Sequence, residues 1–328
     1  MSITDDLRYW LPVSLQTLED EPVCRWVYTG GLRFTEPFFL ETMTHTRRFI
    51  ENNRRYRSFS GLQPVRDWGE AMGGPPPAAF IFHVSRCGST LLSQLMALSP
   101  EHTVLSEVPF LDEVLRVSYR HPDITEEERK RIFRAALYLY GTAGGGGEVF
   151  VKTDSWHIFF YPLLRALYPD TPFILLYREP AAILRSQQKK RGMHAVSGII
   201  EPQLFGWAPG EMQGLALDDY LARVIERYYE TFLDIAAKDP RALLVNYSEG
   251  MAAIAKKMYA FMGKPMTAAE AEQMEERGRF HAKRPEEVFS ESPVLPPLNE
   301  QWSRAGTLYE ELEALRVSAP QLRKHVTA

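Results

Sequence analysis

Short, largely apolar runs recur through the middle of the chain at residues 79–84, 149–152, 172–177 and 243–247, and a further short strand is expected at 104–108, where Val104, Leu105 and Val108 flank Ser106 and Glu107. Continuous apolar runs bounded by turns are typical of strands buried on both faces of a parallel sheet. Between the runs, apolar residues recur at helical spacing over segments 89–98, 111–117, 125–140, 157–167, 180–190 and 216–237. The alternation predicts an α/β chain with right-handed crossovers: a three-layer fold whose central parallel sheet of about five strands is flanked by helices.

The two ends of the chain follow other patterns. Residues 1–77 are rich in aromatic side chains, show helical spacing at 38–53 and end in a Gly/Pro linker at 73–77, so we expect an N-terminal extension packed on a domain of residues 78–328. A structural cover is the favoured role; capping an active site or forming a homodimer contact are alternatives. Beyond the last run, the pattern predicts helices near 250–262, 267–277 and 307–316, and an irregular Pro-rich stretch at 285–300.

Composition excludes several classes of protein. The net charge of −4 gives no basic surface for nucleic acid. Cys24 and Cys87 are the only cysteines, too few for a disulfide framework or a four-thiolate metal site. No run approaches the roughly 18 apolar residues of a membrane span, and the first residues lack the apolar core of a secretory signal. We expect a cytoplasmic protein without a membrane partner.

The first chemical motif is the turn between the strand at 79–84 and the helix that begins at Ser89, with the sequence Ser-Arg-Cys-Gly-Ser-Thr. The first turn of a helix offers unpaired N–H groups and the positive end of the helix dipole. Gly88 lets the backbone approach a ligand, and Arg86 adds a positive charge, so the turn predicts a phosphate or sulfate site. A helix-capping turn without a ligand is the alternative. The P-loop of ATP-hydrolysing enzymes would need glycine at His83 and lysine at Ser89, which argues against ATP hydrolysis.

Arg86, Cys87, Gly88, Ser89 and Thr90 resemble the [KR]-S-G-[ST]-T loop of the sulfotransferases that use 3′-phosphoadenosine 5′-phosphosulfate (PAPS), with cysteine at the second position. The nearest motifs are those of the tyrosylprotein sulfotransferase-like and bacterial branch. The resemblance implies a P-loop-like fold, PAPS as donor, adenosine 3′,5′-bisphosphate (PAP) as product, and a loop that holds the 5′ phosphosulfate.

The same resemblance assigns the rest of the donor site. The family has an arginine at a strand end and a serine eight positions later for the 3′ phosphate, which correspond to Arg178 and Ser186. Tyr247 matches a strand-end tyrosine near the adenine. Lys283 and Arg284 take the place of the C-terminal basic segment that closes over the 3′ phosphate. The alternative for Arg178 is a structural salt bridge.

Catalytic roles also follow from the resemblance. Glu107 corresponds to the glutamate that acts as general base in the tyrosylprotein branch, and Lys152 to the lysine that stabilises the leaving oxygen, together with Arg86. In the cytosolic branch the base is the histidine of a K-T-H pattern, and Asp154 stands at that position here. Glu107 is therefore the first candidate for the base, Asp154 the second and His157 a distant third. Each of the three also has a structural alternative, such as helix capping or ion pairing.

These features predict a sulfotransferase that moves a sulfuryl group from PAPS to a hydroxyl, phenol or amine of a small-molecule acceptor. No metal is required, and no clustered ligand set appears in the sequence. Two alternatives stay open: a nucleotide or phosphometabolite kinase of P-loop type, and a non-catalytic nucleotide-binding protein.

Overall fold

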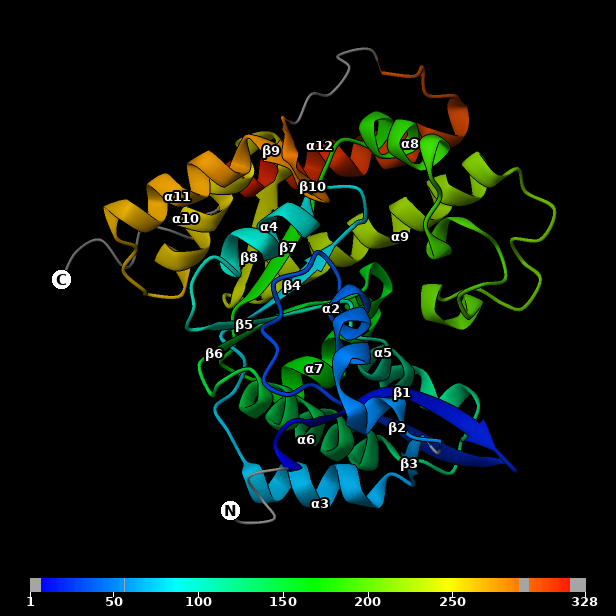
Figure 1. Ribbon diagram of the computed structural model, residues 1–328. Helices are drawn as coiled ribbons and strands as arrows, with labels where there is room; N and C mark the ends of the chain where they lie inside the picture. Colours follow the sequence, from blue (N-terminus) through cyan, green and yellow to red (C-terminus); the bar gives the residue numbers. More distant parts are fainter. Residues whose placement is uncertain (1–6, 56, 289–294, 319–328) are drawn as a thin grey trace. The chain divides into compact units, whose positions relative to one another are not determined.

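The computed structural model describes residues 7–55, 57–288 and 295–318. It contains a five-stranded parallel sheet with the strand order β5-β6-β4-β7-β8, flanked by helices (Figure 1). The strands are β4 (Ala79–His83), β5 (His102–Ser106), β6 (Glu148–Lys152), β7 (Phe173–Tyr177) and β8 (Ala242–Asn246). Each overlaps one of the apolar runs, so the predicted α/β fold with a parallel sheet is confirmed.

Burial explains why these short runs form strands. Every residue of β4, β7 and β8 is buried, as expected for parallel strands covered on both faces. The register aligns the strand ends: Ser106 of β5 lies opposite Lys152 of β6, and Tyr177 of β7 lies opposite Asn246 of β8. The segments that follow two paired strands therefore begin next to each other at the same edge of the sheet.

The chain forms two compact units, the first of which takes in the described residues of 1–80, 96–153 and 162–171. It includes an antiparallel sheet of the order β1-β2-β3 (Figure 1). Its further elements are β1 (Trp10–Leu18), β2 (Glu21–Tyr28), α2 (Phe39–His45), β3 (Ser58–Ser60), α3 (Gln63–Met72), α5 (Pro109–Arg116) and α6 (Glu126–Ala143).

The sequence did not predict these antiparallel strands. The β1–β2 turn uses Glu19 and Asp20, both with positive φ, in place of the glycine or asparagine that marks such turns. The helix expected over 38–53 is also shorter, because α2 ends at His45 and two 3-10 turns follow. The predicted boundary at residue 77 stays a prediction.

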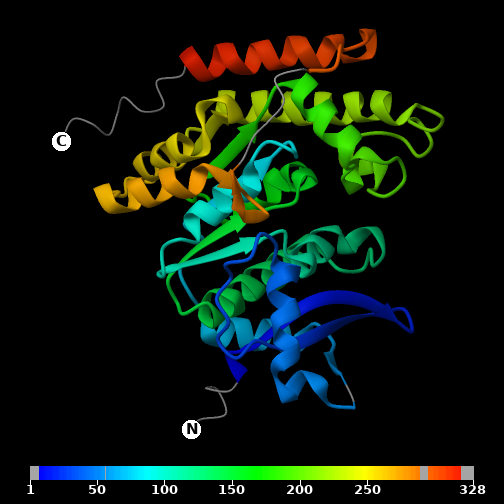
Figure 2. The same cartoon turned by 45° about the horizontal axis from the view of Figure 1, so that its top comes forward.

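The second unit takes in the described residues of 81–95, 154–161 and 172–328. Its helices are α4 (Ser89–Met96), α8 (Pro180–Lys189), α9 (Leu217–Lys238), α10 (Met251–Phe261), α11 (Ala268–Gly278) and α12 (Ser303–Ser318). The helix α12 packs along α9 through buried Ala305, Leu308 and Leu312 (Figures 1 and 2). The stretch 285–300 is not irregular throughout, since β10 (Arg284–Val288) pairs with β9 (Phe280–His281); residues 289–294 lie outside the described part.

Within the described ranges, no helix is both long and apolar enough to span a bilayer.

Close packing of α3 on α6 depends on Gly69, because a Cβ there would lie 2.3 Å from the carbonyl oxygen of Ala135. We expect Gly69→Ala to lower the free energy of unfolding by about 1–3 kcal/mol, the usual cost of overpacking against backbone. Urea denaturation measures the change. As a control, Gly278→Ala adds a methyl group with no atom within 4 Å and should leave stability unchanged or slightly raised. Equal effects of the two substitutions would contradict the prediction.

Candidate functional site

The turn between β4 and α4 has an unusual backbone. Ser85 and Arg86 have φ of 66° and 52°, and Gly88 has φ of 83°. Outside the β1–β2 turn, Glu107 is the only other non-glycine residue of the described chain with positive φ. Non-glycine residues in the left-handed region are strained and gather at functional sites. Here all three are residues of the predicted site or its flank.

Gly88 and Cys87 fix the path of this turn. A Cβ on Gly88 would lie 2.9 Å from the ring of Tyr247 and 3.0 Å from Sδ of Met251, so a side chain there would fill the space beside the tyrosine. Cys87 is buried, and its thiol donates to the carbonyl oxygen of Leu176 at 3.5 Å. The cysteine therefore ties the turn to β7, and it does so with a weak donor in place of the serine hydroxyl.

Two guanidinium groups lie next to this turn. Arg86 donates to the carbonyl oxygens of Ser186 (3.1 Å) and Lys190 (2.9 Å) at the end of α8. Arg178 is buried at the end of β7, donates to the carbonyl oxygen of Arg86 at 3.0 Å, and stacks 4.0 Å from the ring centre of Tyr247. Burial, and then repulsion from Arg178, lower the pKa of Arg86. Close positive charges of this kind favour an anion.

The residues predicted for the donor thus come together within one unit: the turn, Arg178, Ser186 and Tyr247. Nε of Arg86 is buried and has no hydrogen-bond partner in the part of the chain that the structure describes. A buried donor without a partner is costly, and a phosphate oxygen would satisfy it. Ser89 is buried and Thr90 half-buried at the start of α4. These observations fit a bound nucleotide phosphate.

Lys283 and Arg284 lie at the turn of the β9–β10 hairpin and are exposed. Arg277 of α11 holds this hairpin, donating to the carbonyl oxygen of Ala282 at 3.1 Å and to the side chain of Gln94 on α4. The hairpin is thereby connected to α4, the helix that follows the turn at 85–88.

In the other unit, Lys152 at the end of β6 and Glu107 just after β5 form an ion pair. The Lys152 side chain is fully buried, whereas that of Glu107 is 26% exposed. The N–H of Glu107 donates to the carbonyl oxygen of Lys152 at 2.9 Å. This backbone bond, with φ of 52° at Glu107, directs the carboxylate to the ammonium group. The predicted base and the predicted lysine are thus in direct contact.

Asp154 and His157 contact each other at the start of a 3-10 helix (Ser155–Phe160). Asp154 is its N-cap, and the N–H of Asp154 donates to Nδ1 of His157 at 3.3 Å. The side chain of His157 is almost fully buried. This capping arrangement gives both residues a structural role.

Sequence reasoning missed two contributions to the site. Phe38, from the N-terminal extension, places its ring 5.2 Å from Nζ of Lys152. Gln187, fully buried, donates to Oγ of Ser85 at 3.2 Å and contacts Nε2 of His194 at the same distance. Gln187 directly follows Ser186 in the sequence, and a polar residue on the apolar side of α8 is the signal that was available.

A profile described as the sulfotransferase family matches residues 77–267. The match covers the turn between β4 and α4, Lys152 and Arg178 at two strand ends, and Tyr247. The chain is also 30% identical over 146 residues to "Nodulation protein NoeE" of Sinorhizobium fredii strain NBRC 101917 / NGR234. That match covers 39% of this chain and 35% of the relative. The chain therefore spans only about a third of the length of this relative.

Among solved structures, the chain is similar to a sulfotransferase domain from the curacin biosynthetic pathway, with a TM-score of 0.44 and 14% identity. That similarity covers 73% of this chain and 99% of the domain. Sulfotransferase STF1 from Mycobacterium tuberculosis H37Rv gives a TM-score of 0.43 and 15% identity, covering 65% of this chain and 74% of that one.

Gly88 offers a direct test of the turn as a ligand site. Gly88→Ala should weaken binding of PAP by at least about tenfold, because the methyl group would enter the space beside Tyr247 where a ligand is expected. Isothermal titration calorimetry measures the affinity. Gly250→Ala is the matched control, since Gly250 has the same φ of 83° and no atom within 4 Å of its added Cβ. If both variants bind PAP equally well, Gly88 does not line the ligand site.

Proposed function

The chain belongs to the sulfotransferase family, and we propose that it transfers a sulfuryl group from PAPS to a hydroxyl, phenol or amine of a small-molecule acceptor. The observation that carries the proposed chemistry is the ion pair between the buried ammonium of Lys152, at the end of β6, and the partly exposed carboxylate of Glu107, just after the adjacent strand β5. A proton acceptor and a positive charge are the two groups that sulfuryl transfer requires.

The donor would be held by residues of the second unit. The N–H groups of the turn at 85–88 and the start of α4, with Ser89 and Thr90, would bind the 5′ phosphosulfate. Arg178, Ser186 and the unpaired Nε of Arg86 would bind phosphate oxygens. The face of Tyr247 suits an adenine ring. Lys283 and Arg284 would add charge from the β9–β10 hairpin.

The proposed reaction exchanges one bond at sulfur for another. The acceptor atom bonds to sulfur while the bond from sulfur to the bridging oxygen of the donor breaks, giving the sulfated acceptor and PAP. Glu107 takes the proton that the acceptor loses. Lys152 and Arg86 stabilise the negative charge that develops on the donor oxygens.

Glu107 is a better base than Asp154 on two grounds. The Glu107 carboxylate is partly exposed and contacts the lysine that serves the leaving group. Asp154 is engaged as the N-cap of the 3-10 helix and contacts His157. A capping carboxylate is needed for the local fold, so Asp154 is less available to an acceptor than Glu107.

A kinase is disfavoured by the same turn. Ser89 occupies the position of the P-loop lysine, which in kinases and ATPases contacts the transferred phosphate. The cationic groups here are arginines that come from the turn itself and from the end of β7.

The proposed donor site predicts selective binding of PAP over ATP without magnesium. Arg178→Ala should weaken PAP binding roughly 30- to 100-fold, the effect expected from losing charge-assisted hydrogen bonds of about 2–3 kcal/mol. Calorimetry on wild type and variant measures this. Arg304→Ala, which removes an exposed arginine paired with Glu230, is the control and should leave PAP binding unchanged. Preference for ATP in wild type would favour the kinase, and no binding of either nucleotide would contradict the PAPS donor.

The proposed base predicts a separation of turnover from binding. Glu107→Gln keeps the size of the side chain but removes its proton-accepting carboxylate, so kcat should fall roughly 100- to 10,000-fold. PAP affinity should change little, which also verifies that the variant is folded although Lys152 loses its counter-charge.

Asp154→Asn serves as the comparison for Glu107→Gln. Asparagine also caps helices, so this variant should keep most of its activity. A larger loss of kcat in Asp154→Asn than in Glu107→Gln would transfer the role of base to Asp154.

A further inference from the structure

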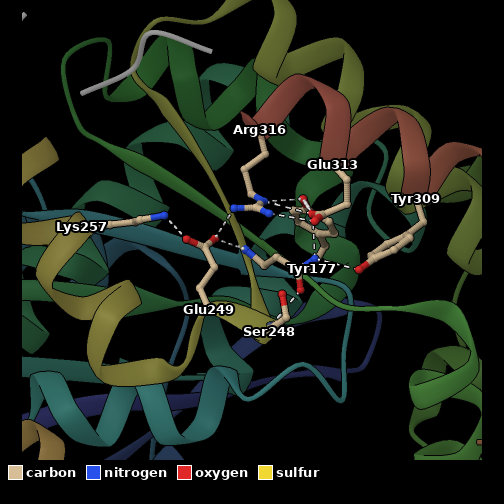
Figure 3. Close-up of polar contacts among 8 residues, drawn as sticks. Tyr177, Ser248, Glu249, Lys257, Tyr309, Glu313 and Arg316 are labelled. Carbon is tan, nitrogen blue, oxygen red and sulfur yellow. Dashed lines mark hydrogen bonds and ion pairs between the residues drawn. The ribbon is translucent and has the colours of Figure 1, made fainter. Parts of the chain in front are cut away.

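The C-terminal helix α12 lies outside residues 77–267 that match the family profile, yet it contacts the strand ends that carry two proposed donor residues (Figure 3). Tyr177 immediately precedes Arg178, and Asn246 immediately precedes Tyr247. The two residues are opposite each other in the β7–β8 register. Both are almost completely buried.

Glu313 of α12 binds both strand ends at once. Its Oε1 accepts hydrogen bonds from the phenol of Tyr177 and from Nδ2 of Asn246, the latter at 2.7 Å. Nδ2 of Asn246 also donates to the phenolic oxygen of Tyr309, one helical turn before Glu313, at 3.0 Å. Arg316 donates to the two carboxylate oxygens at 3.0 and 2.8 Å. One carboxylate therefore joins β7, β8 and α12 (Figure 3).

The charges around Glu313 alternate in sign. Arg316 also lies 3.4 Å from Oε1 of Glu249, whose other oxygen contacts Lys257 (Figure 3). Oε1 of Glu249 accepts the backbone N–H of Asn246 at 2.8 Å. The backbone and the side chain of Asn246 are thus both held by this network, which consists of Lys257, Glu249, Arg316 and Glu313.

The Glu313 carboxylate is ionised over the whole physiological range. Partial burial would raise its pKa, but hydrogen bonds from Arg316, Asn246 and Tyr177 lower the pKa of Glu313 to about 2. A depressed carboxyl pKa stabilises the folded state above the unfolded value of about 4.3, and this stabilisation is lost as pH falls through about 2. The Glu313 carboxylate therefore keeps its negative charge between pH 5 and 8.

We propose that Glu313 is a positioning residue for the donor site. Its role rests on the proposed function: by fixing Tyr177 and Asn246, it sets the spacing between Arg178 and Tyr247. These two stack with the guanidinium carbon 4.0 Å from the ring centre. The guanidinium group that would bind phosphate and the ring that would bind adenine are each one peptide away from a residue that Glu313 holds.

Steady-state kinetics separate this role from simple anchoring of α12. Glu313→Gln keeps an acceptor for Tyr177 or Asn246 but removes the charge that orders Arg316. We expect about a tenfold rise in the KM for PAPS and in the Kd for PAP, with kcat at saturating PAPS and the KM for the acceptor unchanged. The rise should be constant between pH 5 and 8, because Glu313 is ionised throughout that range.

Two further variants complete the test. Glu310→Gln removes an exposed carboxylate from the same helix and should leave all the parameters at their wild-type values. Tyr177→Phe removes one hydrogen bond to Glu313 while keeping the buried ring, and it should raise the PAPS KM in the same direction by a smaller factor. It provides the measurement if Glu313→Gln does not fold.

The outcomes distinguish this role from the function it rests on. The positioning role is overturned if both Glu313→Gln and Tyr177→Phe keep the wild-type KM for PAPS, whether or not their melting temperatures fall. That result would leave the proposed donor site intact. The positioning role is also overturned if kcat falls and the acceptor KM rises by factors similar to the rise in the PAPS KM. Such a result would mean that the substitution loosens the fold as a whole. Failure of the wild-type protein to bind PAP overturns the proposed function itself, and the positioning role with it.

Discussion

A buried positive charge at the end of a strand must be compensated, and this constraint shapes the chemistry of the first unit. The ammonium group of Lys152 has no exposed surface, and an unpaired buried charge would cost several kcal/mol. Glu107 supplies the opposite charge, and its left-handed backbone turns the carboxylate toward Nζ immediately after β5. The backbone strain at Glu107 is offset by the ion pair that this conformation permits. The carboxylate and the ammonium group of this pair are the proton acceptor and the positive charge of the proposed transfer.

The same constraint operates in the second unit without a carboxylate in the described contacts of Arg86. Carbonyl oxygens of Ser186 and Lys190 satisfy some of its N–H groups, but carbonyls bring no net negative charge. Burial and the nearby Arg178 lower its pKa, which is the electrostatic sign of insufficient compensation. An anionic ligand would remove the repulsion and give Nε of Arg86 its missing acceptor. A neutral ligand could accept a hydrogen bond from Nε but would leave the repulsion between the two guanidinium groups, so the electrostatics favour an anionic ligand.

The parallel sheet could be predicted from the sequence, and most candidate site residues could be placed at strand ends, because both steps depend on local signals. Five apolar runs mark β4 to β8, and strand-end residues are found by counting from those runs. The β1–β2 hairpin was not predicted because its turn, Glu19-Asp20, adopts positive φ without a glycine. The contact of Phe38 with Lys152 escaped for another reason: it joins residues more than 100 positions apart, and no periodicity encodes such a pairing.

For the helix α12, the sequence pattern predicted the element but not its polar contacts. The pattern of apolar residues predicted a helix near 307–316, and the structure has α12 at 303–318. Periodicity does not reveal that the polar side of this helix is as constrained as its apolar side. Glu313 accepts from two buried donors on adjacent strands, and buried polar groups without partners are strongly unfavourable. The buried polar groups of Tyr177 and Asn246 therefore obtain hydrogen-bond partners from α12, and α12 in turn buries its apolar side against α9. A family profile that ends at residue 267 describes the residues that would contact the donor, whereas the positions of two of them depend on a helix beyond that limit.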